Sequence, residues 1–221
     1  MNLAIIQARL NSSRLPRKVL IKIAVKPMLW HVVNRVQKAK MIDKVIVAIP
    51  KKEPELLEYC RENKWNVARG SNENVLKRYY YATLPFKPQL PNIVRITSDC
   101  PLIDPDIIDK VISQFMNGVD YVSNVGSGYP DGLDVEVFSY ATLERVYKLA
   151  KTKYDKEHVT SYIYTHPDEF SISSLVHEPD MSHLHWSVDT IQDLRFVRSV
   201  YTKLGNDFCM EDILREIYQI S

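Results

Sequence analysis

The feature that most restricts the fold is the alternation of short apolar segments with segments of helical periodicity. Apolar segments that predict strands occur at 3–7, 44–49, 66–68, 93–97, 121–123, 133–138, 171–176 and 184–188. Helical spacing or capping residues predict helices at 28–39, 54–62, 72–83, 105–116, 140–149, 156–166, 191–204 and 210–220. This order predicts an α/β fold with a mainly parallel sheet between helices. The later strands follow one another closely, so we expect a mixed sheet with an antiparallel part.

A length of 221 residues suits one domain, and we expect residues 1–221 to form it. The longest apolar run, 45–49, is far shorter than the roughly 20 residues of a membrane-spanning helix. The three cysteines are scattered and form no CxxC pair, which argues against a disulfide framework and a four-cysteine zinc site. Pro16 and the strand at 3–7 argue against a transit peptide. We therefore expect a globular cytoplasmic protein with no membrane partner.

The charge is divided unevenly along the chain. Residues 1–42 contain nine basic residues and no acidic residue, and the first carboxylate is Asp43. Residues 43–221 hold the other 20 basic residues and all 27 acidic residues, which gives them a net charge of −7. Such an asymmetry between two parts of a chain indicates an anionic partner.

The segment directly after the first expected strand carries much of the positive charge. It is Gln7-Ala8-Arg9-Leu10-Asn11-Ser12-Ser13-Arg14-Leu15-Pro16-Arg17-Lys18. Ligands of open α/β sheets bind beyond the carboxyl ends of the strands, where this loop begins. Arginine binds phosphate oxygens bidentately, lysine supplies a point charge, and serine hydroxyls add donors, a combination that suits a triphosphate. The alternative is a solvated basic loop; neither the Walker A pattern nor the dinucleotide-binding glycine pattern occurs in it.

Two aspartates follow other expected strands. Asp99 comes after the strand at 93–97, and Asp189 comes after the strand at 184–188 and precedes a helix. Magnesium prefers one or two carboxylates together with phosphate oxygens and water, so these two residues are candidate ligands. The alternative for each is a helix-capping or loop carboxylate.

A second pair of acids and a group of histidines lie further along the chain. Asp134 and Glu136 are two residues apart in an expected strand and would therefore face the same side. Two adjacent carboxylates need a cation or ligand between them, which favours an acceptor-binding or second-metal role over simple exposure to solvent. His183 and His185 lie near other acids and leave a zinc site open as an alternative.

Several segments, taken in order, resemble the cytidylyltransferases that make CMP-activated sugars. That group includes CMP-KDO synthetase, acylneuraminate cytidylyltransferase and the spore-coat polysaccharide type, to which the sequence is most similar. The loop 7–18 resembles the QAR-x-x-S-x-R-L-P-x-K segment of the group. The other similar blocks are Arg69-Gly70-Ser71 with Val75-Leu76-x-Arg78-Tyr79, Arg95 to Pro105, Gly132 to Phe138, Glu157-His158-Val159-Thr160, and Val188-Asp189-Thr190-x-x-Asp193-Leu194.

The resemblance implies a three-layer nucleotidyltransferase fold like that of GT-A glycosyltransferases, with CTP as substrate and Mg²⁺ as cofactor. The catalytic residues that it implies are Arg9, Arg14, Lys18 and Asp99, and the metal ligands are Asp99 and Asp189. The nucleotide-binding residues that it implies are Gln7, Ala8, Arg9, Ser13, Arg14, Lys18, Arg69, Ser71 and Thr97. The acceptor-binding residues are Tyr129, Asp134, Glu136 and His158. Thr97 stands where the KDO and sialic acid branches carry a glutamine near the base, and Asn11 and Arg17 stand where members often carry glycine.

These features predict an enzyme that transfers CMP from CTP to a sugar acid or a related anionic acceptor and releases pyrophosphate, in the biosynthesis of surface polysaccharide. The alternatives are a nucleotide-sugar-dependent glycosyltransferase on the same fold, a cytidylyltransferase for a phosphorylated small acid, and a zinc hydrolase. Nucleic acid is not an expected partner, because the basic residues are confined to a compact segment and the rest of the chain is acidic. A homodimer is left open, since relatives often form one.

Overall fold

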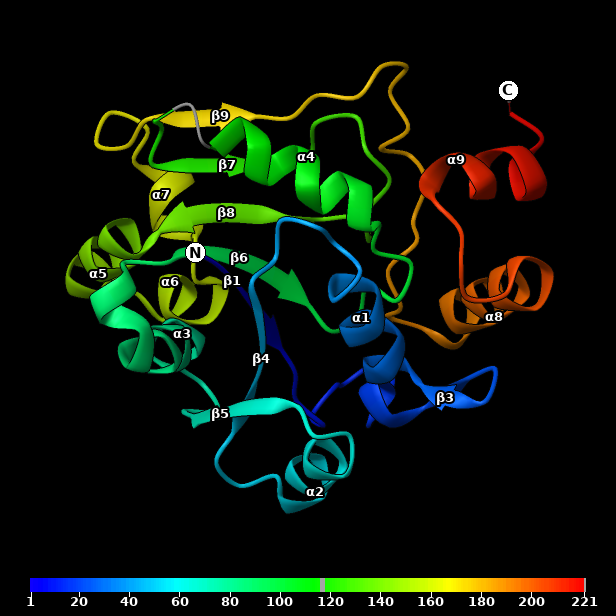
Figure 1. Cartoon of the computed structure of the whole chain (residues 1–221), viewed down its shortest axis with the longest axis horizontal. Helices are drawn as coiled ribbons and strands as arrows, with labels where there is room; N and C mark the ends of the chain where they lie inside the picture. The colour runs from blue at the N-terminus through cyan, green and yellow to red at the C-terminus, as the bar shows by residue number, and fades with distance from the viewer. Residues whose placement is uncertain (116–117, 221) are drawn as a thin grey trace.

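The computed structural model describes residues 1–115 and 118–220, and its central element is a seven-stranded sheet in the order β5-β4-β1-β6-β8-β7-β9 (Figure 1). The strands are β1 Asn2–Gln7, β4 Lys44–Pro50, β5 Asn66–Gly70, β6 Asn92–Thr97, β7 Tyr121–Ser123, β8 Glu136–Ser139 and β9 Ile172–Ser174. Strand β8 is antiparallel to β6 and β7, whereas the other neighbouring strands are parallel. The predicted mixed, mainly parallel sheet is thus confirmed.

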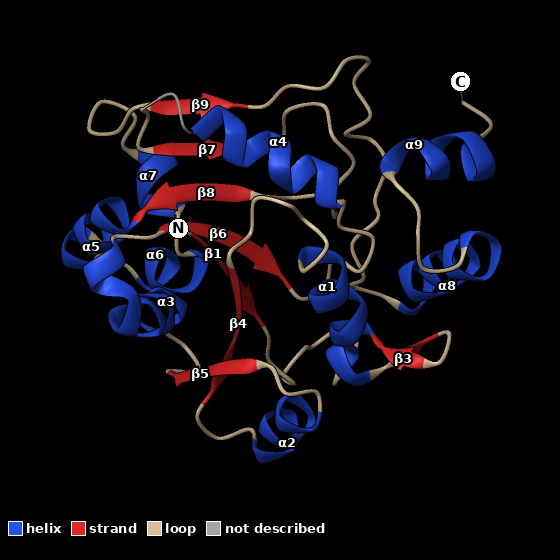
Figure 2. Ribbon diagram, in the orientation of Figure 1, coloured by secondary structure: helices blue, strands red, loops and turns tan. Residues whose placement is uncertain are grey.

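Helices cover both faces of the sheet (Figure 2). They are α1 Met28–Val36, α2 Pro54–Glu62, α3 Val75–Thr83, α4 Pro105–Phe115, α5 Tyr140–Leu149, α6 Lys153–His158, α7 Ser161–Thr165, α8 Ile191–Leu204 and α9 Met210–Ile213, with short helical turns η1 Lys18–Leu20, η2 Leu84–Gln89 and η3 Leu214–Tyr218. The expected end of one helix at Met116 lies outside the described residues. A small hairpin of β2 Lys22–Ile23 and β3 Lys26–Pro27 precedes α1. The apolar periodicity thus predicts most helices.

The two faces of the sheet bury separate apolar clusters. Ala4 and Ile6 of β1 pack in one cluster with side chains from α1, α4 and α8. Leu3 and Ile5 of the same strand pack in the other, with side chains from α3 and α5. Successive strand residues point to opposite faces, so the alternation along β1 produces the three-layer architecture. No helix of the described residues is long and apolar enough to cross a membrane.

Two expected strands were wrong in whole or in part. The segment 184–188 forms no strand and makes only an isolated bridge, between Asp131 and His185. Its backbone donors are divided between two loops, because the N–H of Trp186 donates to the Asp131 carbonyl and that of Val188 donates to the Asp99 carbonyl. The strand expected at 133–138 begins only at Glu136, so Asp134 lies before β8.

The helix expected at 156–166 is two helices, α6 and α7, with a break at Val159 and Thr160. Val159 has a positive φ of 63°. The Thr160 hydroxyl donates to Glu136 Oε1 at 2.5 Å, and the Ser161 hydroxyl donates to Asp155 Oδ1 at 2.8 Å. These contacts hold the chain in a turn that the helical pattern of the sequence does not contain.

Gly132 lies where two backbone segments approach too closely for a side chain. Its φ is 102°, and an added Cβ would lie 2.4 Å from the nitrogen of Ser187 and 2.6 Å from the carbonyl carbon of Trp186. Gly126 also has a positive φ, 64°, but an added Cβ there meets nothing within 4 Å. Both glycines therefore have a left-handed backbone conformation, but only Gly132 lacks room for a side chain.

We expect Gly132→Ala to lower the free energy of unfolding by about 2–6 kcal/mol, because backbone strain of about 1–3 kcal/mol adds to overpacking of similar size. Gly126→Ala suffers the strain alone and should lose about 1 kcal/mol. Urea unfolding of both variants measures the difference. Equal losses would contradict the close approach at Gly132.

Candidate active site

A cavity of about 610 Å³ opens at the carboxyl ends of β1 and β6, the edge of the sheet at which the sequence places a ligand. Eleven of the fifteen predicted site residues line it. These are Gln7, Ala8, Arg9, Ser13, Arg14, Lys18, Thr97, Asp99, Asp134, His158 and Asp189. They come from the loop after β1, the end of β6, the segment before β8, helix α6 and the segment before α8. The fold therefore brings together residues that are far apart in the sequence.

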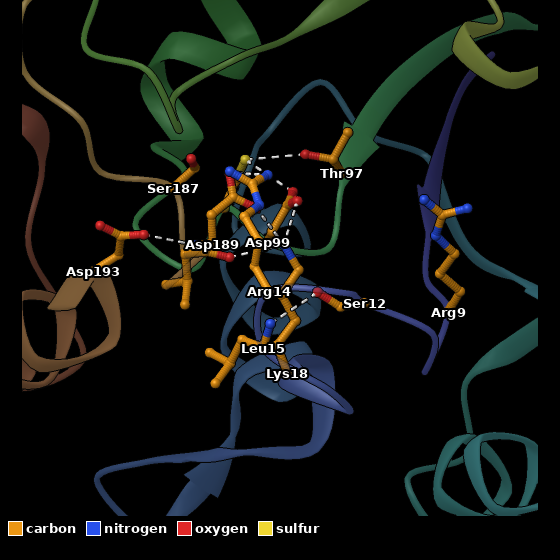
Figure 3. A network of polar contacts seen from close by, with 12 residues as sticks. Arg9, Ser12, Arg14, Leu15, Lys18, Thr97, Asp99, Ser187, Asp189 and Asp193 are labelled. Atoms are coloured by element: carbon orange, nitrogen blue, oxygen red, sulfur yellow. Dashed lines mark hydrogen bonds and ion pairs between the residues drawn. The ribbon is translucent and has the colours of Figure 1, made fainter. Parts of the chain in front are cut away.

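Lys18 is the centre of a compact charged group in this cavity (Figure 3). Its Nζ donates to Asp99 Oδ2 at 2.9 Å, to Asp189 Oδ1 at 2.9 Å and to the carbonyl oxygen of Val188 at 2.8 Å. The lysine side chain is only 11 % exposed, whereas the two carboxylates are 31 % and 22 % exposed. One ammonium thus holds the two predicted metal ligands together at the cavity wall.

The backbone explains why the two aspartates meet. The Val188 N–H donates to the carbonyl of Asp99 at 2.8 Å, which joins the end of β6 to the segment before α8. The N–H groups of Asp189 and Thr190 donate to Asp193 Oδ2 at 2.9 and 2.7 Å. Thr190 and Asp193 form a capping box. The start of α8 therefore fixes the position of the Asp189 carboxylate.

The charges of this group stabilise one another. Burial alone lowers the pKa of Lys18, but the carboxylates of Asp99 and Asp189 outweigh burial and raise it above its ordinary value. Burial alone raises the pKa of Asp99, but the Lys18 ammonium and hydrogen bonds to the carboxylate together outweigh burial and lower it. Lysine and aspartate therefore stay ionised at neutral pH, and their charges are available to a ligand.

The arginines of the loop after β1 take different positions. Arg14 Nη2 lies 2.9 Å from Asp189 Oδ2, and its side chain is 64 % exposed, so it extends the charged group toward solvent. Arg9 lies apart from that group, as Figure 3 shows, and its Nη2 is 3.6 Å from Glu157 Oε1. Arg17 pairs with Glu55 and does not line the cavity. The predicted arginines therefore do not form one cluster: Arg9 and Arg14 line separate parts of the cavity, and Arg17 lies outside it.

Four predicted residues lie elsewhere. Ser71 lines a neighbouring cavity of about 660 Å³. Arg69 donates to the carbonyl oxygen of Lys51, and buried Tyr129 packs against the ring of His177. Glu136 is buried below the cavity, where it accepts hydrogen bonds from the Tyr121 and Thr160 hydroxyls and pairs with an arginine of β6. The expected common face of Asp134 and Glu136 is therefore not present, because Asp134 lies outside the strand.

That arginine is Arg95, one of two cavity-lining arginines to which the sequence analysis gives no role; the other is Arg78 of α3. Arg95 is the single charged residue of the apolar segment 92–97, and a charge in a central strand needs a partner. That pattern was a sign that Arg95 is a site residue. Arg78 gives no such signal, because an arginine on a helix is normally exposed.

Among the described residues, the histidines do not form a zinc site. His185 Nδ1 lies 2.5 Å from Asp131 Oδ2, and its Nε2 is 3.7 Å from Asp193 Oδ2. Within 1–115 and 118–220, no three His, Cys, Asp or Glu residues are arranged to hold a metal ion. His158 is exposed on α6, with its ring against that of Tyr154.

Asp134 combines burial with a surplus of negative charge at the cavity wall. Burial raises its pKa to about 7, and the neighbouring carboxylate of Asp131 adds to the rise. Asp134 is therefore protonated in a large fraction of molecules near neutral pH, and it can exchange a proton with a bound ligand there.

We expect Asp134→Asn to stabilise the protein increasingly from about pH 4 to about pH 7. The folded protein keeps the Asp134 proton up to about pH 7, whereas the unfolded chain releases it near the ordinary value of 3.8. Between these values the folded state binds more protons, so the aspartate lowers stability as the pH rises, and asparagine removes that loss. Melting temperatures at several pH values measure it. Exposed Asp168→Asn is the control, and a difference independent of pH would contradict the raised pKa.

Comparison with known proteins agrees with this architecture. A cytidylyltransferase family model matches residues 3–209. The chain is 37 % identical to the uncharacterised protein MJ1063 of Methanocaldococcus jannaschii, over 97 % of this chain and 88 % of the relative. It is 32 % identical to the spore coat polysaccharide biosynthesis protein SpsF of Bacillus subtilis, over 92 % of this chain and 87 % of the relative.

Solved structures give the same result. A cytidylyltransferase from Leptospira borgpetersenii superposes with a TM-score of 0.92 at 27 % identity, covering 99 % of this chain and 94 % of that one. A CMP-2-keto-3-deoxy-manno-octonic acid synthetase in complex with CTP has a TM-score of 0.72 at 16 % identity, covering 91 % and 98 %. The second likeness shows the shared fold. From the match over residues 3–209 and the relatives of similar length, the chain belongs to the cytidylyltransferase family of enzymes.

Proposed function

We propose that the protein transfers CMP from CTP to a small, negatively charged acceptor such as a sugar acid, and releases pyrophosphate. The observation that carries the proposal is the convergence of the Lys18 ammonium with Asp99 and Asp189 at one wall of the cavity, beside the basic loop. The similarity to SpsF, a spore coat polysaccharide biosynthesis protein, supports a product used in surface polysaccharide.

In the proposed reaction, an acceptor oxygen attacks the α-phosphorus of CTP. A new bond forms between that oxygen and the α-phosphorus, the bond from the α-phosphorus to the bridging oxygen of the β-phosphate breaks, and pyrophosphate leaves with the electron pair. Such a transfer depends on positioning and charge neutralisation more than on covalent help from the protein. Lys18, Arg14 and Arg9 supply positive charge for the triphosphate, and the hydroxyl of Ser13 lies in the same loop.

Asp99 and Asp189 fit the needs of Mg²⁺. Both are carboxylates that face one cation, the Lys18 ammonium, so their oxygens already converge. Two carboxylates with no third ligating side chain among the described residues match an ion that takes its other ligands from phosphate and water. When bound, Mg²⁺ supplies further positive charge to the phosphates. The Lys18 ammonium would then pair with a phosphate oxygen and leave the carboxylates to the ion.

We place the acceptor near Asp134 and His158, which line the same cavity. A carboxylate or phosphate acceptor attacks without a base. A hydroxyl acceptor must lose a proton, and Asp134 suits this task because its pKa of about 7 lies near the working pH.

The test is a pyrophosphate-release assay in which each nucleoside triphosphate is combined with each member of an acceptor panel. The panel contains eight- and nine-carbon sugar acids and phosphorylated small acids, and Mg²⁺ is varied. We expect release with CTP and at least one anionic acceptor. A preference for another triphosphate, or no release with any acceptor, would overturn the proposal.

A glycosyltransferase of the same fold is the second candidate, because it too would bind a nucleotide and a metal in this cavity. It would consume a nucleotide-sugar and release a nucleotide without forming pyrophosphate. Incubation with a panel of CMP- and UDP-sugars, followed by analysis for free CMP and UDP, separates the two candidates.

A further inference from the structure

Arg78 is a charged side chain of the cavity whose buried nitrogens have no hydrogen-bond partner among the described residues. Arg78 is 2 % exposed, and its Nε and Nη1 are buried and make no hydrogen bond within the described chain. Burial without hydrogen bonds is costly for a guanidinium, and native structures normally avoid it. Arg78 also lines the cavity beside Gln7 and Val75, so a ligand there can reach it. An arginine in this state calls for a ligand that completes its hydrogen bonds.

The local backbone makes room for this arginine. Gly70, the last residue of β5, lies against it, and an added Cβ at Gly70 would be 2.9 Å from both Cβ and Cγ of Arg78. The helix α3 carries Arg78 on the same side as the buried residues Val75 and Tyr79. The base of the side chain therefore packs against β5, and the whole side chain is buried.

Unpaired hydrogen-bond acceptors lie in the same region as the unpaired donors of Arg78. The Oε1 of Gln7 and the Oε2 of Glu53 are also buried without a hydrogen-bond partner in the described residues. Gln7 lines the same cavity as Arg78, and Glu53 lines the neighbouring one and is among the charges that act on Arg78. Unpaired donors and unpaired acceptors thus lie in one region, which is distinct from the group formed by Lys18 and the two aspartates.

A phosphate or carboxylate offers only acceptors, so it would satisfy Arg78 and leave Gln7 Oε1 unpaired, and Glu53 would repel it. The edge of a pyrimidine base offers both kinds of atom. Cytosine presents an amino donor at N4 and acceptors at N3 and O2, which complement an amide oxygen and arginine N–H groups. Uracil presents a carbonyl at position 4 and an N–H at N3. Its carbonyl would face the amide oxygen of Gln7, and its N–H would face the N–H groups of Arg78, so neither contact could form a hydrogen bond.

We propose that Arg78, together with Gln7, binds the hydrogen-bonding edge of cytosine and discriminates CTP from UTP. This inference rests on the proposed function, in which Lys18, Arg14 and Arg9 bind the triphosphate and the base occupies the part of the cavity that Arg78 and Gln7 line. Thr97 is less suited to discriminate the base, because its hydroxyl is 3.1 Å from Cys100 Sγ.

The test compares the wild type with Arg78→Met in calorimetric titrations with CTP, UTP and inorganic tripolyphosphate, each with Mg²⁺ and without acceptor. We expect the affinity for CTP to fall at least about tenfold and the preference for CTP over UTP to shrink by a similar factor. The affinity for tripolyphosphate should stay within about twofold, since the proposal places the phosphates at the basic loop and not at Arg78. The melting temperature should not fall, because methionine removes an unpaired buried charge. The control is Lys77→Met, at the exposed neighbouring position of α3, which should change none of these values.

Three results would overturn the inference. An equal loss of affinity for CTP and tripolyphosphate would assign Arg78 to the phosphates. Unchanged affinity for CTP with a raised KM for the acceptor, measured by pyrophosphate release, would assign it to the acceptor. A lower melting temperature with unchanged affinities would assign it a structural role. A wild type that binds CTP selectively and releases no pyrophosphate with any acceptor would refute the transfer reaction and leave the base assignment standing.

Discussion

Replacing Lys18 by alanine is expected to lower kcat about 10²- to 10³-fold, as the loss of a preorganised charge in a transition state typically does. The ammonium lies within 2.9 Å of Asp99 and Asp189, and its side chain is only 11 % exposed. Charges in such a place act on a ligand more strongly than charges in bulk water. Steady-state pyrophosphate release with saturating CTP measures the loss.

The same variant separates a catalytic role from a structural one. Without the ammonium, the carboxylates of Asp99 and Asp189 keep only the exposed Arg14 as a positive partner, so the melting temperature should fall in the absence of divalent ions. Added Mg²⁺ should restore more of it than in the wild type, because the ion replaces the lost positive charge. Lys22→Ala, an exposed position on β2, is the matched control and should keep full activity. Near-wild-type kcat for Lys18→Ala would refute the phosphate assignment.

The strands that could be predicted are those whose sequence is apolar because both of their faces are buried. The segments 44–49 and 93–97 agree with β4 and β6 within one residue at each end. The segment 184–188 is also rich in apolar residues, but the strand predicted there was wrong. Its N–H groups bond to Asp131 and Asp99, which lie far away in the sequence, so no local pattern contains the information.

The candidate site could be predicted as a set of positions, because ligand-binding residues of α/β sheets follow strands. Asp99 fits that rule because it follows β6, and Lys18 lies in the loop after β1, but Asp189 follows no strand. The direct contact between Lys18 and Asp189 joins residues 171 positions apart. Arg78 was not predicted, since a helix with buried Val75 and Tyr79 gives no sign that its arginine is buried as well. Its importance comes from unpaired nitrogens, which only the folded chain reveals.

Asp99→Asn should lower activity by roughly 10³-fold, if the carboxylate contributes the several kcal/mol that a bound metal supplies to phosphoryl chemistry. Asparagine has almost the same shape and loses the charge. The substitution weakens the binding of Mg²⁺, and it removes the largest cause that raises the pKa of Lys18. We therefore expect the Mg²⁺ concentration for half-maximal activity to rise at least about tenfold, because an anionic oxygen ligand is lost.

The Mg²⁺ dependence is what distinguishes this role from simple charge balance. If Asp99 only held Lys18 in place, Asp99→Asn would lower kcat but leave the Mg²⁺ requirement unchanged, and Lys18→Ala would add little further loss. If Asp99 holds the ion, both values change, and the double variant loses more than either single one. Exposed Asp168→Asn, which also removes one negative charge, controls for the effect of net charge and should leave both kcat and the Mg²⁺ requirement as in the wild type.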